Sequence, residues 1–160
     1  MTILGIDPGS TVTGYGLIQH EDRVSRLLEC GCIRTKARTS FPERLKKIYA
    51  ELTDRLAELR PDEVAVEDVF YSENVKAALR IGHARGVILL AAANAGVPIA
   101  EYTPREVKRA VVGSGAASKE QVQFMVKHIL HLKELPHPYD VTDALAVALC
   151  HIHRLGSPVG

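Results

Sequence analysis

Short apolar runs separated by turn signals divide the first part of the chain into three expected strands. Residues 2–6 are almost continuously apolar, as in a strand buried on both faces, and the turn Pro8-Gly9-Ser10 follows them. Two further runs, 14–18 and 24–35, flank the polar pair Glu21-Asp22. Because the connections are short, we expect the three strands to be antiparallel neighbours.

From residue 40 onward, helical periodicity alternates with short apolar runs. Ser40 is an expected N-cap, and apolar residues then recur at helical spacing until the stop at Arg60-Pro61. Capping-box patterns that begin at Thr103 and Ser118 mark two further helix starts. The remaining expected elements are strands at 63–67 and 99–102 and helices at 74–95 and 140–154. This order predicts an α/β fold in which a five-stranded mixed sheet carries helices on both faces.

Composition narrows the class of protein. The 160 residues are 46% hydrophobic and 24% charged, which argues against disorder, and we expect one domain over residues 1–156 with a short tail at 157–160. The net charge of +1 excludes a uniformly basic nucleic-acid coat, so a DNA-binding protein would need its positive charge gathered on one face. The sequence has no leader pattern and no apolar run near ~20 residues, so we expect a cytoplasmic protein without a membrane span.

The three cysteines, an odd number, do not suggest a disulfide framework. Cys30 and Cys32 are two apart in an expected strand, so both are interpreted as small apolar residues on one face. A zinc site that uses Cys150, His151 and His153 is the alternative, but these residues lack the paired ligand spacing of such sites.

Four carboxylates lie at the ends of expected core elements. Two of them follow or end strands, and the other two share a face at the start of the last helix. They are Asp7, Glu67, Asp140 and Asp143. Ionised acids are rarely buried unless they are paired or bind a metal, and like charges brought together raise pKa values unless a cation neutralises them. All-oxygen sites of this kind suit Mg²⁺ or Mn²⁺ rather than zinc. The first two acids become neighbours if their strands are adjacent and parallel.

Each acid also has a simpler interpretation. Asp140 and Asp143 lie in a first helical turn, where the helix dipole favours negative charge, and Asp7 before Pro-Gly could be only a turn residue. The conjunction of all four is harder to explain in that way. It indicates a metal-dependent nuclease.

Basic residues gather around the glycine-rich break at Gly113 and Gly115. This candidate DNA-binding surface, for which a solvated surface with scattered charges is the alternative, contains Arg105, Lys108, Arg109 and Lys119. An extension along the long helix is expected at Lys76, Arg80 and Arg85. Phe70 and Tyr71 follow Glu67 in an otherwise polar loop, where they either cover the core edge or stack on an unpaired base.

Several of these segments together resemble the RuvC Holliday junction endonucleases. The resemblance rests on residues 5–10 with 13–16, and then on residues 66–70, 84–87, 111–113 and 140–148, so it covers nearly the whole chain in order. It implies a ribonuclease H-like fold, a homodimer and Mg²⁺-dependent resolution of four-way DNA junctions. It also implies cooperation with a branch-migration motor of the RuvA and RuvB type.

By position, the catalytic acids of that family fall on all four carboxylates. The resemblance implies two Mg²⁺ ions per active site, for which Mn²⁺ would substitute. In two-metal hydrolysis one ion activates a water and the other stabilises the leaving 3′ oxygen. We expect Asp7 to bridge the ions. Glu67 and Asp140 would each hold one side, and Asp143 would complete the second site directly or through water.

The resemblance also assigns two lysines and one aromatic residue. Lys108 and Lys119 match basic positions close to the scissile phosphate, and Phe70 matches an aromatic that probes the junction. The sequence leaves open whether Glu106 or His137 assists at the site.

The long expected helix carries small residues at every fourth position, Ala78, Gly82 and Gly86, which leave a groove along one side. Such a groove lets two helices approach closely. We expect a two-fold dimer through this helix, because a four-way junction has paired strands to cut. The alternative is that the groove packs on the sheet of its own chain.

Three other functions share part of the pattern. The segment 7–11 followed by Gly14 resembles the phosphate loop of actin- or hexokinase-like phosphotransferases, but those folds need two such domains. A related nuclease that acts on precursor ribosomal RNA would share Asp7 without explaining the loop after Glu67. A non-cleaving scaffold that binds junctions would not need four intact acids.

Overall fold

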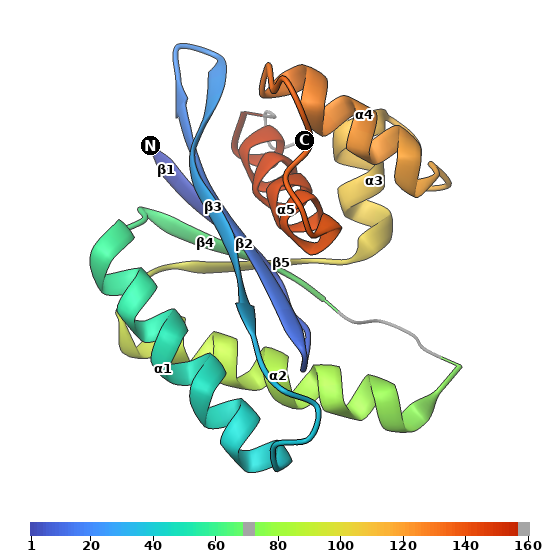
Figure 1. The fold of residues 1–160 in the computed structure, drawn as a ribbon. Coiled ribbons are helices and arrows are strands. Elements are labelled where there is room, and N and C mark those ends of the chain that lie inside the picture. The colour runs from blue at the N-terminus through green and yellow to red at the C-terminus, as the bar shows by residue number, and fades with distance from the viewer. Residues whose placement is uncertain (69–72, 157–160) are drawn as a thin grey trace.

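The computed structural model, which describes residues 1–68 and 73–156, contains a five-stranded sheet (Figure 1). Its strands are β1 (Thr2–Asp7), β2 (Val12–Glu21), β3 (Val24–Arg34), β4 (Glu63–Glu67) and β5 (Ile99–Tyr102). The spatial order is β3-β2-β1-β4-β5, in which β1, β2 and β3 are antiparallel neighbours and β4 and β5 run parallel to β1. The predicted mixed sheet and the antiparallel first three strands are confirmed.

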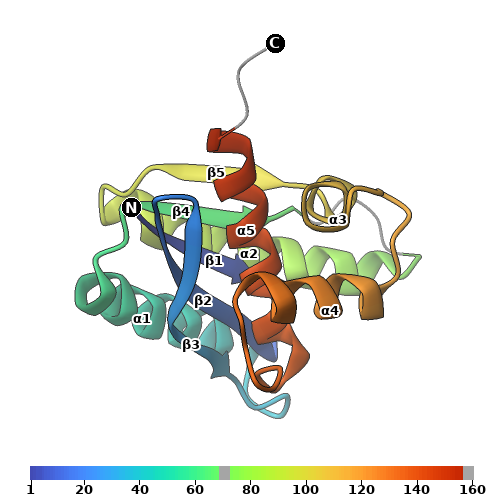
Figure 2. The same ribbon diagram turned by 90° about the horizontal axis from the view of Figure 1, so that it is seen from above.

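Helices cover both faces of the sheet. They are α1 (Phe41–Leu59), α2 (Val75–Asn94), α3 (Pro104–Val112), α4 (Lys119–Ile129) and α5 (Tyr139–Gly156). The pair α1 and α2 lies on one face, while α3, α4 and α5 lie on the other (Figure 2). Side chains alternate along β1, so Leu4 and Ile6 enter the core beneath α1 and α2 whereas Ile3 enters the core around α5. The α/β architecture predicted from the sequence is confirmed.

Element boundaries follow the local signals with two differences. Thr103 and Ser118 each form the predicted capping box at the start of α3 and α4. Ser40 precedes α1, but its side chain makes no capping hydrogen bond; Pro42 in the first turn has no N–H to offer it. β2 extends well beyond the predicted 14–18, because its backbone pairs with β1 on one side and β3 on the other.

Two glycines let α5 lie directly against the sheet. Gly5 of β1 faces the backbone of Ala144, and a methyl group at this position would overlap it. Gly14 of β2, which pairs with Asp7, faces the backbone of Asp140 in the same way. The lack of a side chain at Gly5 and Gly14 therefore determines how closely the start of α5 approaches the end of β1.

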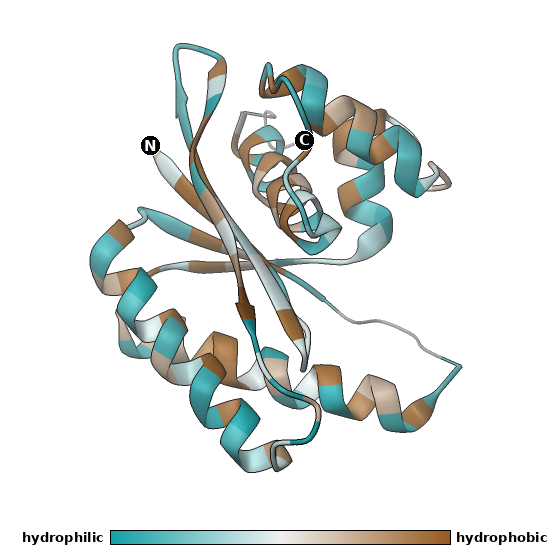
Figure 3. Cartoon of the chain, in the orientation of Figure 1, coloured by the Kyte–Doolittle hydropathy of each residue, from teal (hydrophilic) through white to brown (hydrophobic). Residues whose placement is uncertain are grey.

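The outer face of α2 is apolar and open. Hydrophobic colours run along much of this helix, whereas α1 alternates hydrophilic and hydrophobic residues (Figure 3). A methyl group added at Gly82 or Gly86 would meet nothing within 4 Å. The exposed apolar side chains of the helix are Val75, Leu79 and Leu90. The groove at these glycines therefore does not pack on the sheet of its own chain, and that alternative is wrong.

Two findings concern membrane-spanning helices and the cysteines. In the described ranges, no helix has both the length and the apolar character needed to cross a membrane. Cys30, Cys32 and Cys150 are free thiols, as predicted. Cys150 is buried in α5, and burial raises its pKa to about 12, so it behaves as a small apolar core residue.

Candidate active site

Asp7 and Glu67 are neighbours at the carboxyl edge of the sheet. β1 and β4 are adjacent and parallel, with Ile6 opposite Val66, so the residues that end these strands lie side by side. Their carboxyl groups share a hydrogen bond. Burial, followed by the negative charge of Glu67, raises the pKa of Asp7 to about 9, and burial also raises the pKa of Glu67. In the absence of a cation, these raised pKa values favour one proton on the pair over two negative charges at neutral pH.

The start of α5 adds two carboxylates to this pair. The charges of Asp143 and Asp140 further raise the pKa of Asp7, after the larger effects of burial and Glu67. Burial raises the pKa of Asp143 as well, while the hydrogen bond that Lys119 Nζ donates to Asp143 Oδ2, at 3.1 Å, lowers it. The structure thus brings together all four acids that the sequence singles out.

The chemistry of the cluster fits a hard divalent cation. Four carboxylates offer only oxygen ligands, and the proton held by Asp7 and Glu67 indicates that the site does not carry its full negative charge unaided. A cation would bind to the carboxylate oxygens of this cluster. In residues 1–68 and 73–156, no group of three His, Cys, Asp or Glu side chains is arranged so that it could hold a metal ion.

A cleft of about 780 Å³ opens beside the acids. Asp7 and Asp140 line it, together with the turn that follows β1. Lys76 and Arg80, from the first turns of α2, line the same cleft. Two of the predicted DNA-binding residues therefore share a cavity with the acidic cluster.

Lys108 of α3 and Lys119 of α4 lie within electrostatic reach of the acids. Burial is the largest influence on the pKa of Glu67 and raises it, and the positive charges of both lysines lower it. Lys119 also forms an ion pair with Asp143. The two lysines predicted to lie near the scissile phosphate are therefore close to the carboxylates.

The other two basic residues of the glycine-rich region occupy different places on α3. Arg105 packs its side chain against Gly115. Arg109 lines a separate cavity of about 310 Å³ together with His153 and Arg154 near the end of α5. Their predicted role in DNA binding stays a prediction.

Arg85 of α2 makes internal ion pairs. Its Nη2 lies 2.9 Å from Glu101 Oε2 and 3.4 Å from Asp68 Oδ1, which ties α2 to β5 and to the residue after Glu67. Its Nε is buried and has no hydrogen-bond partner among the described residues. Phe70 and Tyr71, the predicted aromatic residues of the next loop, lie outside the described ranges.

Comparison with known proteins agrees with this geometry. The family model described as crossover junction endodeoxyribonuclease RuvC matches residues 3–151. The chain belongs to the RuvC family. A RuvC relative from Syntrophomonas wolfei is 54% identical over 159 residues, which cover 98% of this chain and 92% of the relative. The resemblance inferred from the sequence is confirmed, and the chain is a crossover junction endodeoxyribonuclease of this family.

Two solved RuvC structures from Thermus thermophilus share the fold of the chain. One is 41% identical with a TM-score of 0.89 and covers 98% of this chain and 97% of its own. The other, RuvC in complex with Holliday junction substrate, is 40% identical with a TM-score of 0.91 and covers 97% and 94%. The predicted ribonuclease H-like fold is confirmed.

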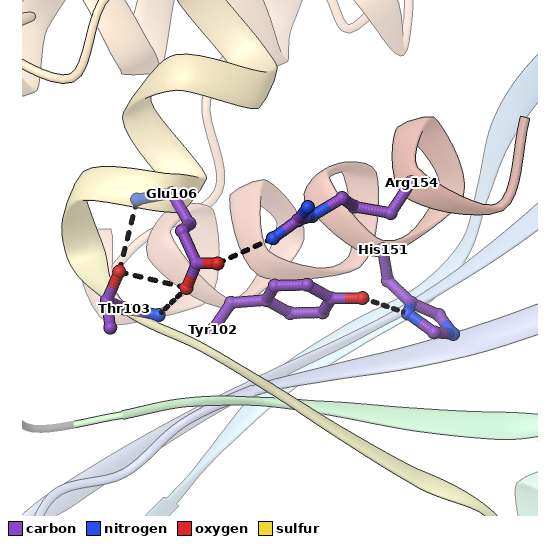
Figure 4. Close-up of polar contacts among 5 residues, drawn as sticks. All are labelled: Tyr102, Thr103, Glu106, His151 and Arg154. Atoms are coloured by element: carbon purple, nitrogen blue, oxygen red, sulfur yellow. Dashed lines mark hydrogen bonds and ion pairs between the residues drawn. The ribbon is translucent and has the colours of Figure 1, made fainter. Parts of the chain in front are cut away.

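In this RuvC chain, the two residues whose role the sequence leaves open have other partners. Glu106 completes the capping box with Thr103 and also forms an ion pair with Arg154 (Figure 4). The hydrogen bonds from Thr103 lower the pKa of Glu106, and its carboxylate ties α3 to the end of α5. The ring of His137 packs against Tyr139, with the ring centres 4.8 Å apart.

Two buried polar groups of the RuvC chain were not found from the sequence. His151 links α5 to β5 and β4. Its Nδ1 lies 2.6 Å from Tyr102 Oη, a contact that Figure 4 shows, and its Nε2 lies 2.7 Å from Glu63 Oε2. Arg44 of α1 is buried and donates hydrogen bonds to Ser10. Its signal was a charged residue on the apolar stripe of a predicted helix, where a core residue is expected.

Proposed function

We propose that this RuvC-family endonuclease resolves four-way DNA junctions by paired, symmetric hydrolytic nicks, in recombination and repair. The observation that carries the proposal is the meeting of four carboxylates, which belong to Asp7, Glu67, Asp140 and Asp143. The Thermus thermophilus RuvC that was solved with Holliday junction substrate supports the choice of DNA junctions as substrate.

Two Mg²⁺ ions, replaceable by Mn²⁺, would supply an activated water and stabilise the leaving 3′ oxygen. Asp7 would hold both ions, a role supported by the charges of the other three acids, which all act on it. Glu67 and Asp140 would each hold one ion, and Asp143 would complete the second site directly or through water. Bound cations would lower the raised pKa values of Asp7 and Glu67, so that both carboxyl groups would bind as carboxylates and release their protons to solvent.

Lys108 and Lys119 hold the scissile phosphate beside the acids. Their effect on the pKa of Glu67 and the 3.1 Å contact between Lys119 Nζ and Asp143 Oδ2 support this role. Ammonium groups at this distance from the carboxylates offset the repulsion between the phosphate and the acids. Phe70 stacks on an unpaired base of the junction, a role that rests on the sequence alone.

A two-fold dimer through the outer face of α2 presents two identical active sites to the paired strands of a junction. The exposed apolar side chains of Val75, Leu79 and Leu90 and the open space at Gly82 and Gly86 support this interface. A branch-migration motor of the RuvA and RuvB type is the further partner that we propose, in the cytoplasm.

Cleavage of three substrates in Mg²⁺ tests the proposed function: a mobile four-way junction, a linear duplex of the same sequence and a structured RNA. We expect paired cuts at symmetric positions of the junction, with the duplex and the RNA intact. Asp7→Asn is the matched control, which should bind the junction without cutting it, because removing a negative charge does not weaken attraction to phosphate. Cleavage of duplex or RNA at a comparable rate would contradict the proposal, and so would binding without cleavage by the wild type.

A further inference from the structure

Arg44 is a buried cation whose partners are all neutral. The residue is only 4% exposed. Its Nε donates to the Ser10 carbonyl at 3.1 Å and to Thr35 Oγ1 at 3.3 Å, and its Nη2 donates to the Ser10 carbonyl at 2.9 Å and to Ser10 Oγ at 3.0 Å. Nη1 donates to no atom of residues 1–68 and 73–156. A buried charge is costly without a counter-charge, so this position favours an anion.

Phe41 contacts a second guanidinium group in addition to that of Arg44. The guanidinium carbon of Arg44 lies 5.5 Å from the centre of the Phe41 ring, and that of Arg80 lies 5.6 Å from the same centre. Contact with the same aromatic ring holds both cations in place. Lys76 precedes Arg80 by one helical turn on α2 and so lies on the same side of that helix.

Within the described ranges these three cations have no acidic partner, and they line the cleft beside the acids. In the part of the chain that the structure describes, none of them forms an ion pair. Arg44, Lys76 and Arg80 line the cleft of about 780 Å³ together with Asp7 and Asp140. Acids that bind metal and cations that bind phosphate in one cleft suit successive phosphates of a single DNA strand.

We propose that Arg44, Lys76 and Arg80 form a subsite for a backbone phosphate of the cleaved strand, adjacent to the scissile phosphate. The inference rests on the proposed function and specifies how the cleft holds the strand. Because Arg44 also donates to Ser10 in the turn after Asp7, a phosphate bound here is linked through one side chain to the segment that carries the central acid.

A purely structural role is the competing explanation for Arg44. In that case the side chain only anchors the turn at Ser10, and the charges of Lys76 and Arg80 are incidental. Such a role does not respond to the charge of any particular phosphate. The decisive measurement is therefore the response of binding to the loss of a single phosphate charge.

Junctions that carry one neutral methylphosphonate, placed in turn at each position flanking the cleavage site, provide this measurement. In metal-free buffer we expect the wild type to lose about tenfold in affinity at one flanking position, the value of one charge-assisted contact. Arg80→Gln should bind the unmodified junction more weakly than the wild type does. A methylphosphonate at the sensitive position should then reduce the affinity of this variant by less than about twofold, because the contact is already absent. Its log–log salt slope should fall by about one.

Lys46→Gln is the matched control, since it removes one positive charge from an exposed position of α1 that does not line the cleft. A methylphosphonate at the sensitive position should reduce the affinity of this variant as much as it reduces that of the wild type. Arg44→Gln should repeat the Arg80→Gln pattern; because Arg44 is buried, the exposed Arg80 keeps the test valid if that variant fails to fold.

Two results would overturn the subsite while leaving the proposed function intact. One is a wild type that cuts junctions but shows no sensitive flanking position. The other is an Arg80→Gln variant that retains the full tenfold penalty. A wild type that binds the unmodified junction no better than linear duplex would overturn the proposed function and the subsite with it.

Discussion

Replacing Asp7 by Asn should stabilise the metal-free protein while it abolishes cleavage. The folded chain keeps the Asp7 proton at neutral pH, whereas the unfolded chain releases it near pH 3.8. At pH 7 the raised pKa lowers the free energy of unfolding by at most about 4 kcal/mol, because each pH unit above the unfolded value of 3.8 corresponds to about 1.4 kcal/mol. Water in the cleft and local relaxation reduce the cost. We therefore expect a gain of about 1–2 kcal/mol, or about 2–8 °C in Tm for a chain of this size.

The gain from Asp7→Asn should depend on pH with a definite sign. Because the pKa of Asp7 is raised in the folded state, the cost is absent below the unfolded value of 3.8 and grows as the pH rises toward about 9. Thermal melts in a chelator should show the gain at about pH 7.5 and almost none at about pH 4.5.

Asp62→Asn is the matched control for these melts. Hydrogen bonds from Thr2 lower the pKa of Asp62, so its stabilising contribution is present above pH 3.8 and is lost as the pH falls. This variant should give no gain at neutral pH. A Tm for Asp7→Asn that is equal to or below the wild type at both pH values would refute the reasoning about the acidic cluster.

Three further substitutions test separate parts of the molecule. Gly14→Ala should leave a folded sheet but push the start of α5 away from β1, so junction cleavage should fall by about 100-fold with binding retained; an unchanged rate would contradict the packing argument. Lys119→Gln should slow cleavage and lower the log–log salt slope of junction binding by about one, and an unchanged slope would place the phosphate elsewhere. Gly86→Arg on the outer face of α2 should give a folded monomer in sedimentation that no longer makes paired nicks, which a dimeric, fully active variant would disprove.

Much of the fold follows from local signals in the sequence. Turn residues, capping boxes and helical periodicity place most elements correctly, because each of these acts within a few residues of the chain. The convergence of Asp7 and Glu67 also follows, since both end strands that the order of elements makes parallel neighbours. β2 was predicted too short, because its ends are set by pairing with β1 and β3 and not by its own apolar residues.

Features that depend on packing between distant segments were not accessible in this way. The close approach of α5 relies on space at Gly5 and Gly14, which no local pattern reveals. The ion pairs of Arg85 with Asp68 and Glu101 were also not predicted from the sequence, because they join α2 to β5 and to the end of β4; the expected role of Arg85 in DNA binding stays a prediction. The partners of Arg44 do not follow from local pattern, because Ser10, which accepts most of its hydrogen bonds, lies 34 residues earlier in the chain.

Paired nicking of a single junction tests most directly the claim that the four carboxylates resolve four-way DNA. A supercoiled plasmid that extrudes a cruciform reports it in one gel, because two nicks made in one binding event linearise the plasmid, whereas isolated nicks give open circles. With Mg²⁺, we expect the wild type to convert the plasmid directly to linear DNA and Asp7→Asn to leave it supercoiled. Accumulation of open circles by the wild type, or linear product from Asp7→Asn, would contradict the claim.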